Sequence, residues 1–112
     1  MHERLRGRAK RVLLVGTPDE NHDISPESAL ASDGTIIVME SNATRVADMR
    51  RRFSSDGFAG RVTIIAGDPR RMLYKLSGPF DVIFCSATYL SARPLLEKLL
   101  APDGVLIAND ST

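Results

Sequence analysis

Several residues that could bind a ligand follow apolar runs directly in this sequence. Glu40 follows one run and Gly67-Asp68 the next, while Gly16 and Ser86 follow two others. A carboxylate in such a place can accept hydrogen bonds from both hydroxyls of a ribose. An acidic side chain beside backbone amides can bind an adenine edge. Each acid alone is typical of a helix start, but the pair indicates a nucleoside site.

The elements that must position these residues alternate regularly along the chain. Apolar, β-rich runs cover residues 12–15, 35–39, 62–66, 80–84 and 105–108. Continuous apolar runs are typical of parallel strands with helices on both faces. We therefore predict an α/β fold, a Rossmann-like doubly wound parallel sheet with strand order 3-2-1-4-5 in a three-layer sandwich. Ligands of such sheets bind beyond the carboxyl ends of the strands.

Capping residues mark the expected helices between these strands. The predicted starts are Ser25 before Pro26, Ser41-Asn42, Asp68 before Pro69, and Ser91. The first helix should cover residues 26–31 after a loop over residues 17–24, and Gly57 should end the second. Residues 101–104, Ala-Pro-Asp-Gly, should turn the chain into the fifth strand.

Composition limits the class of protein. The 112 residues are 43% hydrophobic and 26% charged, with a formal net charge of +1. These values predict one globular domain over residues 1–112, with a basic lead-in over 1–10, and argue against a nucleic-acid or membrane partner. The single cysteine, Cys85, fits a reducing, cytoplasmic location.

With these motifs in place, the chain resembles S-adenosylmethionine-dependent methyltransferases, most closely the small-molecule O-methyltransferases of the catechol and caffeoyl-CoA type. The resemblance covers nearly the whole chain and rests on VLLVGT, GTIIVMES, RVTIIAGDPRRML, GPFDVIFCSA and LLAPDGVLIAND. It implies S-adenosylmethionine as cofactor and methyl transfer to a small molecule. It also implies that Gly16 lies under the methionine part and that Glu40 holds the ribose.

The same resemblance implies further cofactor contacts. Ser41 would flank the adenine, and Asp68 with Pro69 would bind its edge. The remaining cofactor-binding positions that it implies are Thr17, Gly67 and Ser86. No catalytic residue is assigned, because neither His22 nor Cys85 lies in a recognisable catalytic pattern.

Two departures from the family pattern support a second hypothesis. The family has G-x-G-x-G where this chain has Gly16-Thr17-Pro18-Asp19-Glu20, and Pro18 excludes both a positive φ and a backbone donor. Ser86 stands where the metal-dependent subgroup has an aspartate, and the following acid-amide pair is inverted to Asn109-Asp110. We therefore expect no divalent metal. The alternative is a catalytically inactive binding or regulatory module of the same fold.

Two other α/β classes fit less well. A nicotinamide-binding domain would share Glu40 but needs the glycine fingerprint that this chain lacks. A phosphoacceptor receiver domain needs acids after its first strand and a lysine after its fifth, where this chain has Gly16 and Asn109.

The fifth strand raises the question of a partner. In the family that the chain resembles, further strands extend the sheet beyond strand five. Here that strand is an apolar edge that includes Val105, Leu106 and Ile107. Open apolar edges template pairing with another chain. We expect a homodimer, or another partner chain, to cover this strand.

Overall fold

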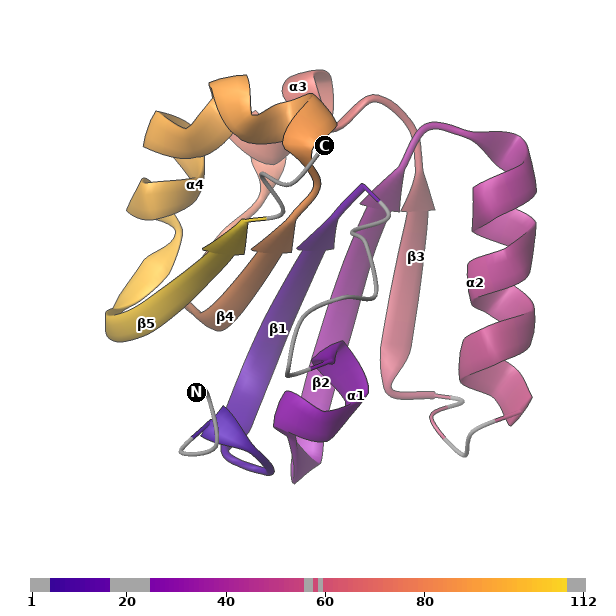
Figure 1. The fold of residues 1–112 in the computed structure, drawn as a ribbon, viewed down its shortest axis with the longest axis horizontal. Coiled ribbons are helices and arrows are strands. Elements are labelled where there is room, and N and C mark those ends of the chain that lie inside the picture. Colours follow the sequence, from indigo (N-terminus) through magenta and orange to yellow (C-terminus); the bar gives the residue numbers. More distant parts are fainter. Residues whose placement is uncertain (1–4, 17–24, 56–57, 59, 109–112) are drawn as a thin grey trace.

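The computed structural model describes residues 5–16, 25–55, 58 and 60–108 of the chain. Its five strands form one sheet in the order β3-β2-β1-β4-β5, and every neighbouring pair is parallel (Figure 1). The strands are β1 (Ala9–Val15), β2 (Leu30–Glu40), β3 (Val62–Ala66), β4 (Phe80–Cys85) and β5 (Leu100–Ala108). The predicted strand order is confirmed.

Helices cover both faces of this sheet. The helices of one face are α1 (Pro26–Ala29) and α2 (Ala43–Ser55). Those of the other face are α3 (Pro69–Met72), α4 (Arg93–Lys98) and two 3-10 helices, η2 (Leu73–Lys75) and η3 (Ala87–Ala92). Alternate residues of β1 join different hydrophobic clusters, with Val12 and Leu14 on the first face and Leu13 and Val15 on the second. This period of two produces the predicted three-layer sandwich.

Most of the predicted helix starts are confirmed. The Ser25 hydroxyl accepts a hydrogen bond from the Ser28 N–H at 3.1 Å, which fixes Pro26 as the first residue of α1. The Asn42 side chain accepts from the Arg45 N–H at 3.0 Å at the start of α2. Gly57, the predicted end of that helix, lies outside the described residues.

Two predicted helix boundaries are wrong. Helix α1 ends at Ala29, because Leu30 and Ala31 already belong to β2. Ser91 does not cap the last helix, because the chain first makes the 3-10 helix η3 and α4 begins only at Arg93.

Two similar turns explain why β2 and β5 begin earlier than predicted. In β2, Leu30 pairs with Ala9 and Thr35 pairs with Arg11, so residues 31–34 bulge out between the two pairs. In β5, residues 101–104 bulge out in the same way between partners of Phe80 and Val82. Both turns end in Asp-Gly. The predicted turn at 101–104 is therefore present, inside the strand rather than before it.

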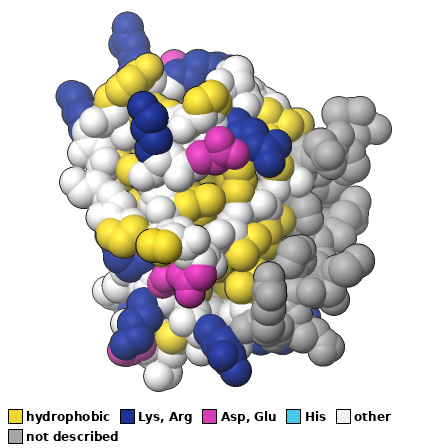
Figure 2. Space-filling model, turned by 90° about the vertical axis from the view of Figure 1, so that its left-hand side faces the viewer, with side chains coloured by type: hydrophobic (Ala, Val, Ile, Leu, Met, Phe, Trp, Pro, Cys, Tyr) yellow, Lys and Arg dark blue, Asp and Glu magenta, His cyan; other side chains and the backbone are white. Residues whose placement is uncertain are grey.

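Strand β5 lies at one side of the sheet, and in the described part of the chain it pairs only with β4. On this side of the molecule, hydrophobic side chains lie at the surface between charged ones (Figure 2). A partner chain along β5 stays a prediction. Among the described residues, no helix has the length and apolar character needed to cross a membrane.

The glycines of the two bulged turns generate a stability prediction. A Cβ on Gly34 would lie 2.6 Å from the Ala9 carbonyl oxygen, and one on Gly104 would lie 2.9 Å from that of Phe80. We expect Gly34→Ala to lower the free energy of unfolding by about 1–3 kcal/mol, because sheet backbone must shift. Urea unfolding would measure this change. The exposed Ser32→Ala change in the same turn should stay within about 0.5 kcal/mol, and equal effects of the two changes would contradict the prediction.

Candidate functional site

The carboxyl ends of the parallel strands meet at one edge of the sheet. Val15 pairs with Met39 on one side and with Cys85 on the other. The residues that follow, Gly16, Glu40 and Ser86, therefore lie at the same level, at the carboxyl ends of β1, β2 and β4. These positions belong to the predicted cofactor-binding set, and the fold brings them together.

Gly16 adopts a conformation that requires glycine. Its φ is +77°, and its N–H donates to the Met39 carbonyl at 2.8 Å. A Cβ at this position would lie 2.5 Å from the Ser86 hydroxyl and 2.9 Å from a ring carbon of Tyr89. Both the left-handed backbone and this close approach exclude larger side chains.

Glu40 is a buried carboxylate at the end of β2. It is 1% exposed, and its Oε2 accepts a hydrogen bond from the Asn42 N–H at 2.8 Å. Its backbone carbonyl accepts from the Gly67 N–H at 3.0 Å, which joins the ends of β2 and β3. An ionised carboxylate has about four acceptor positions, so this side chain can serve more than one donor.

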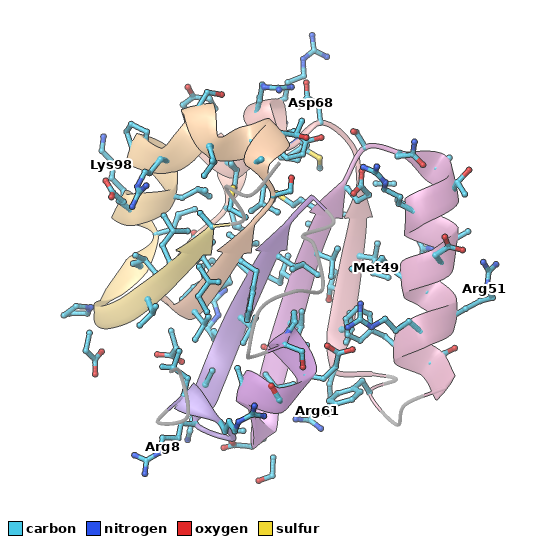
Figure 3. All side chains as sticks on the ribbon, in the orientation of Figure 1. Arg8, Met49, Arg51, Arg61, Asp68 and Lys98 are labelled. Atoms are coloured by element: carbon cyan, nitrogen blue, oxygen red, sulfur yellow. The ribbon has the colours of Figure 1, made fainter. Side chains whose placement is uncertain are left out.

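Asp68 begins α3 with its side chain. Its Oδ1 accepts from the Arg70 N–H at 3.0 Å, and Arg70 Nη1 lies 3.7 Å from the same oxygen. Pro69 is buried as the first residue of the helix. A Cβ on Gly67 would lie 2.5 Å from the Met72 sulfur. Asp68 therefore acts as a helix cap, while part of its side chain still faces solvent near the carboxyl ends of the strands (Figure 3).

Tyr89 is a residue of this edge that the sequence interpretation missed. It is 6% exposed, and its hydroxyl lies 3.0 Å from the Ser41 hydroxyl. The guanidinium carbon of Arg70 lies 4.9 Å from the centroid of its ring. An aromatic residue shortly after the polar end of the fourth strand was the available signal. Its proximity to Gly16 depends on the folded chain.

Some predicted positions lie outside the described residues. These are Thr17, the rest of the altered loop through residue 24, and Asn109 with Asp110. Within the described residues, no group of three or more His, Cys, Asp or Glu side chains is arranged to hold a metal ion.

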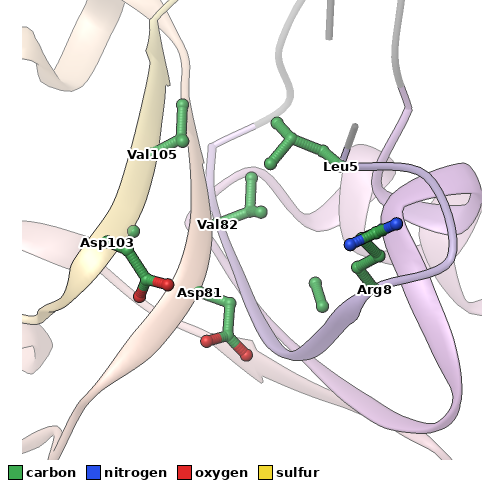
Figure 4. A pocket seen from close by; sticks show the side chains of 8 residues that line it. Leu5, Arg8, Asp81, Val82, Asp103 and Val105 are labelled. Atoms are coloured by element: carbon green, nitrogen blue, oxygen red, sulfur yellow. The ribbon is translucent and has the colours of Figure 1, made fainter. Parts of the chain in front are cut away.

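A cavity of about 540 Å³ lies away from this edge, at the amino ends of β1 and β4 and beside the β5 turn (Figure 4). Val82, Val105 and Leu5 line it together with the charged residues Arg8, Asp81 and Asp103. Asp81 links β4 to β1 there, because its Oδ2 accepts hydrogen bonds from the N–H groups of Lys10 and Arg11 at 2.9 and 3.1 Å. This cavity is therefore separate from the predicted ligand site.

Known proteins share this fold. Neither protein-family comparison nor comparison with curated sequences gives a match. Among solved structures, the O-methyltransferase TomG from Streptomyces achromogenes in complex with S-adenosylmethionine has a TM-score of 0.72 at 24% identity, over 89% of this chain and 48% of that chain. The Podospora anserina methyltransferase bound to S-adenosylhomocysteine has a TM-score of 0.74 at 24% identity, over 90% of this chain and 46% of that one.

A third similar structure is the O-methyltransferase from Bacillus cereus in complex with S-adenosylhomocysteine, with a TM-score of 0.72 at 22% identity over 89% and 49% of the two chains. The chain spans about half the length of these relatives. The fold is thus a Rossmann-like doubly wound sheet. More narrowly, these methyltransferase structures have the same fold.

The geometry at Gly16 generates a matched pair of variants. Gly60 also has a positive φ, +84°, but a Cβ there would meet nothing within 4 Å. We expect Gly60→Ala to lower the free energy of unfolding by about 1–2 kcal/mol, because only its left-handed backbone is strained. Gly16→Ala should cost about 1–3 kcal/mol more, because its Cβ also collides with Ser86 and Tyr89. Chemical denaturation would compare them, and equal losses would show that the crowding over Gly16 is absent.

The burial of Cys85 leads to a prediction about how the free energy of unfolding changes with pH. The thiol is fully buried, and this burial raises its pKa to about 11, although the positive charge of Arg93 acts in the opposite direction. Between pH 9 and 11 the unfolded chain loses the thiol proton while the folded chain keeps it. The free energy of unfolding should therefore fall with rising pH, by about 1.4 kcal/mol per pH unit at most. In Cys85→Ala the free energy of unfolding should fall less steeply with pH. Urea unfolding at several pH values would measure this, and the same pH dependence in both proteins would refute the prediction.

Proposed function

We propose that this chain binds S-adenosylmethionine at the carboxyl edge of its sheet and acts as an O-methyltransferase on a small molecule. One observation carries the proposal. Gly16, with its positive φ, follows β1, and the buried carboxylate Glu40 is the last residue of the adjacent strand β2. Similar structures that contain S-adenosylmethionine or S-adenosylhomocysteine support it at the level of the fold.

The residues of this edge have chemistry that fits an adenosyl ligand. Glu40 would accept hydrogen bonds from the ribose hydroxyls, because a buried carboxylate is a strong acceptor for paired donors. Gly16 would let the methionine part approach the backbone closely. Ser41, with Gly67, Asp68 and Pro69, would bind the adenine, and Thr17 and Ser86 would complete the set.

When bound, the cofactor supplies a methyl group activated by its sulfonium charge. The chain's own contribution is to hold the donor so that an acceptor can approach in line, and such positioning accounts for much of the rate of a transfer reaction. Because the chain spans about half the length of its structural relatives, the acceptor, its binding site and any partner along Val105, Leu106 and Ile107 are part of the proposal.

A catalytically inactive binding or regulatory module of the same fold is the second candidate. It is favoured by Ser86, which follows β4 and offers a neutral hydroxyl where an acid would be needed for Mg²⁺. We accordingly propose that the site uses no divalent metal. The position of Tyr89 against Gly16 also favours a site with altered ligand binding.

Calorimetric titration with S-adenosylmethionine and S-adenosylhomocysteine tests the proposal. We expect saturable binding, weakened about 10- to 100-fold in Glu40→Gln, because an amide replaces a charged acceptor while the volume is kept. Glu97→Gln, at an exposed position of α4, is the matched control and should bind like the unchanged chain. Circular dichroism would verify that both variants fold.

The outcomes separate the two candidates. Absence of binding at millimolar ligand would refute the proposed cofactor site. Binding without methyl transfer to any of a panel of small hydroxylated aromatic acceptors would favour the inactive module.

A further inference from the structure

The carboxyl ends of β1 and β4 mark the switch point of the sheet. From β1 the chain winds outward to β2 and β3, and it resumes at β4 on the other side of β1. Ligands of open α/β sheets bind at such points. Here the ring of Tyr89 lies in that place, so close to Gly16 that a Cβ there would be 2.9 Å from a ring carbon.

Three contacts from different elements hold Tyr89 in this position. Its hydroxyl shares a hydrogen bond of 3.0 Å with the Ser41 hydroxyl, which follows β2. Arg70, from α3, lies over its ring. Its own N–H donates to the Ser86 carbonyl at 3.0 Å, beside the end of β4.

The backbone of η3 is kinked at Tyr89. Residues of η3 on either side of it are helical, whereas Tyr89 itself has φ −111° and ψ 17°, outside the helical range. Two short helical turns therefore meet at this residue.

We propose that Tyr89 is a gate over the cofactor site, a ring that must leave Gly16 and Ser41 before a ligand can bind there. The inference rests on the proposed function and adds a residue that controls access of the ligand to the cofactor site. Gly16 and Ser41 are two of the predicted cofactor-binding residues, and they are the residues that the Tyr89 ring and hydroxyl contact.

The strength of these contacts suits a gate. A neutral hydroxyl pair and a partly exposed cation–π contact are each modest interactions, and a ligand must also replace the packing of the ring in the second hydrophobic cluster. While the ring is closed, the apparent dissociation constant is the intrinsic one divided by the open fraction. Weakening the closed state should therefore tighten ligand binding.

Calorimetry with S-adenosylhomocysteine tests this expectation. Tyr89→Phe keeps the ring but loses the bond to Ser41, and it should bind about 2- to 10-fold more tightly than the unchanged chain. Tyr89→Ala should bind at least as tightly as Tyr89→Phe. Tyr74→Phe, which removes a hydroxyl from a residue that is 78% exposed, is the control and should leave the affinity unchanged. Weaker binding by Tyr89→Phe would overturn the gate, because the hydroxyl would then serve the ligand.

A fluorescence measurement gives the direction of ring movement independently of affinity. The chain has no tryptophan and two tyrosines, so Tyr74→Phe leaves Tyr89 as the only emitter. Saturating S-adenosylhomocysteine should raise acrylamide quenching of Tyr89 about twofold or more as the ring leaves Gly16 and Ser41. A fall in quenching would mean that the ligand packs over the ring, and it would refute the gate while leaving the cofactor site intact. If neither the unchanged chain nor Tyr89→Ala binds the ligand, the proposed function fails as well.

Discussion

The pairing of β1 with two parallel neighbours is the constraint on which the carboxyl edge depends. Residues 12–15 each pair with β2 on one side and β4 on the other, and all four are at most 1% exposed. A slip of one residue would turn every side chain of the strand to the opposite layer. The register is therefore strongly determined, and with it the common level of Gly16, Glu40 and Ser86 at the carboxyl edge.

Backbone hydrogen bonds then fix the first residue beyond each strand. Gly16 donates to Met39, Ser86 donates to Val15, and Gly67 donates to Glu40. These bonds continue the sheet ladder past the strand ends, so the side chains there start from defined backbone positions. Residues that need precise placement for binding are best carried by such supported positions. Tyr89, one turn further along, has a backbone bond to Ser86 as well, and its side chain contacts Ser41 and Arg70.

The sequence predicted the number and order of the strands better than it predicted where each strand begins. Strand 62–66 has the predicted limits, because Arg61 and Gly67 flank its β-rich run directly. The start of β1 was missed, because the strand begins at Ala9, inside the predicted basic lead-in. The starts of β2 and β5 were missed as well, since the Asp-Gly turns break the apolar pattern although pairing resumes on both sides of each turn. The position of Tyr89 could not be predicted, because its bond to Ser41 joins residues 48 apart in sequence. Propensity and periodicity describe local preference, whereas such contacts arise from tertiary packing.

The central place of β1 also has a consequence for the order in which the chain folds. Strand β2 follows β1 closely, but Asp81 of β4 binds the backbone of Lys10 and Arg11 across separations of 71 and 70 residues. Closing so long a loop carries a higher entropic cost, so we expect the β1–β4 pair to form after the β1–β2 pair. Until then β1 is an apolar strand with one side unpaired, and such edges associate with other chains. A nascent chain on the ribosome therefore exposes its most buried strand until β4 has emerged.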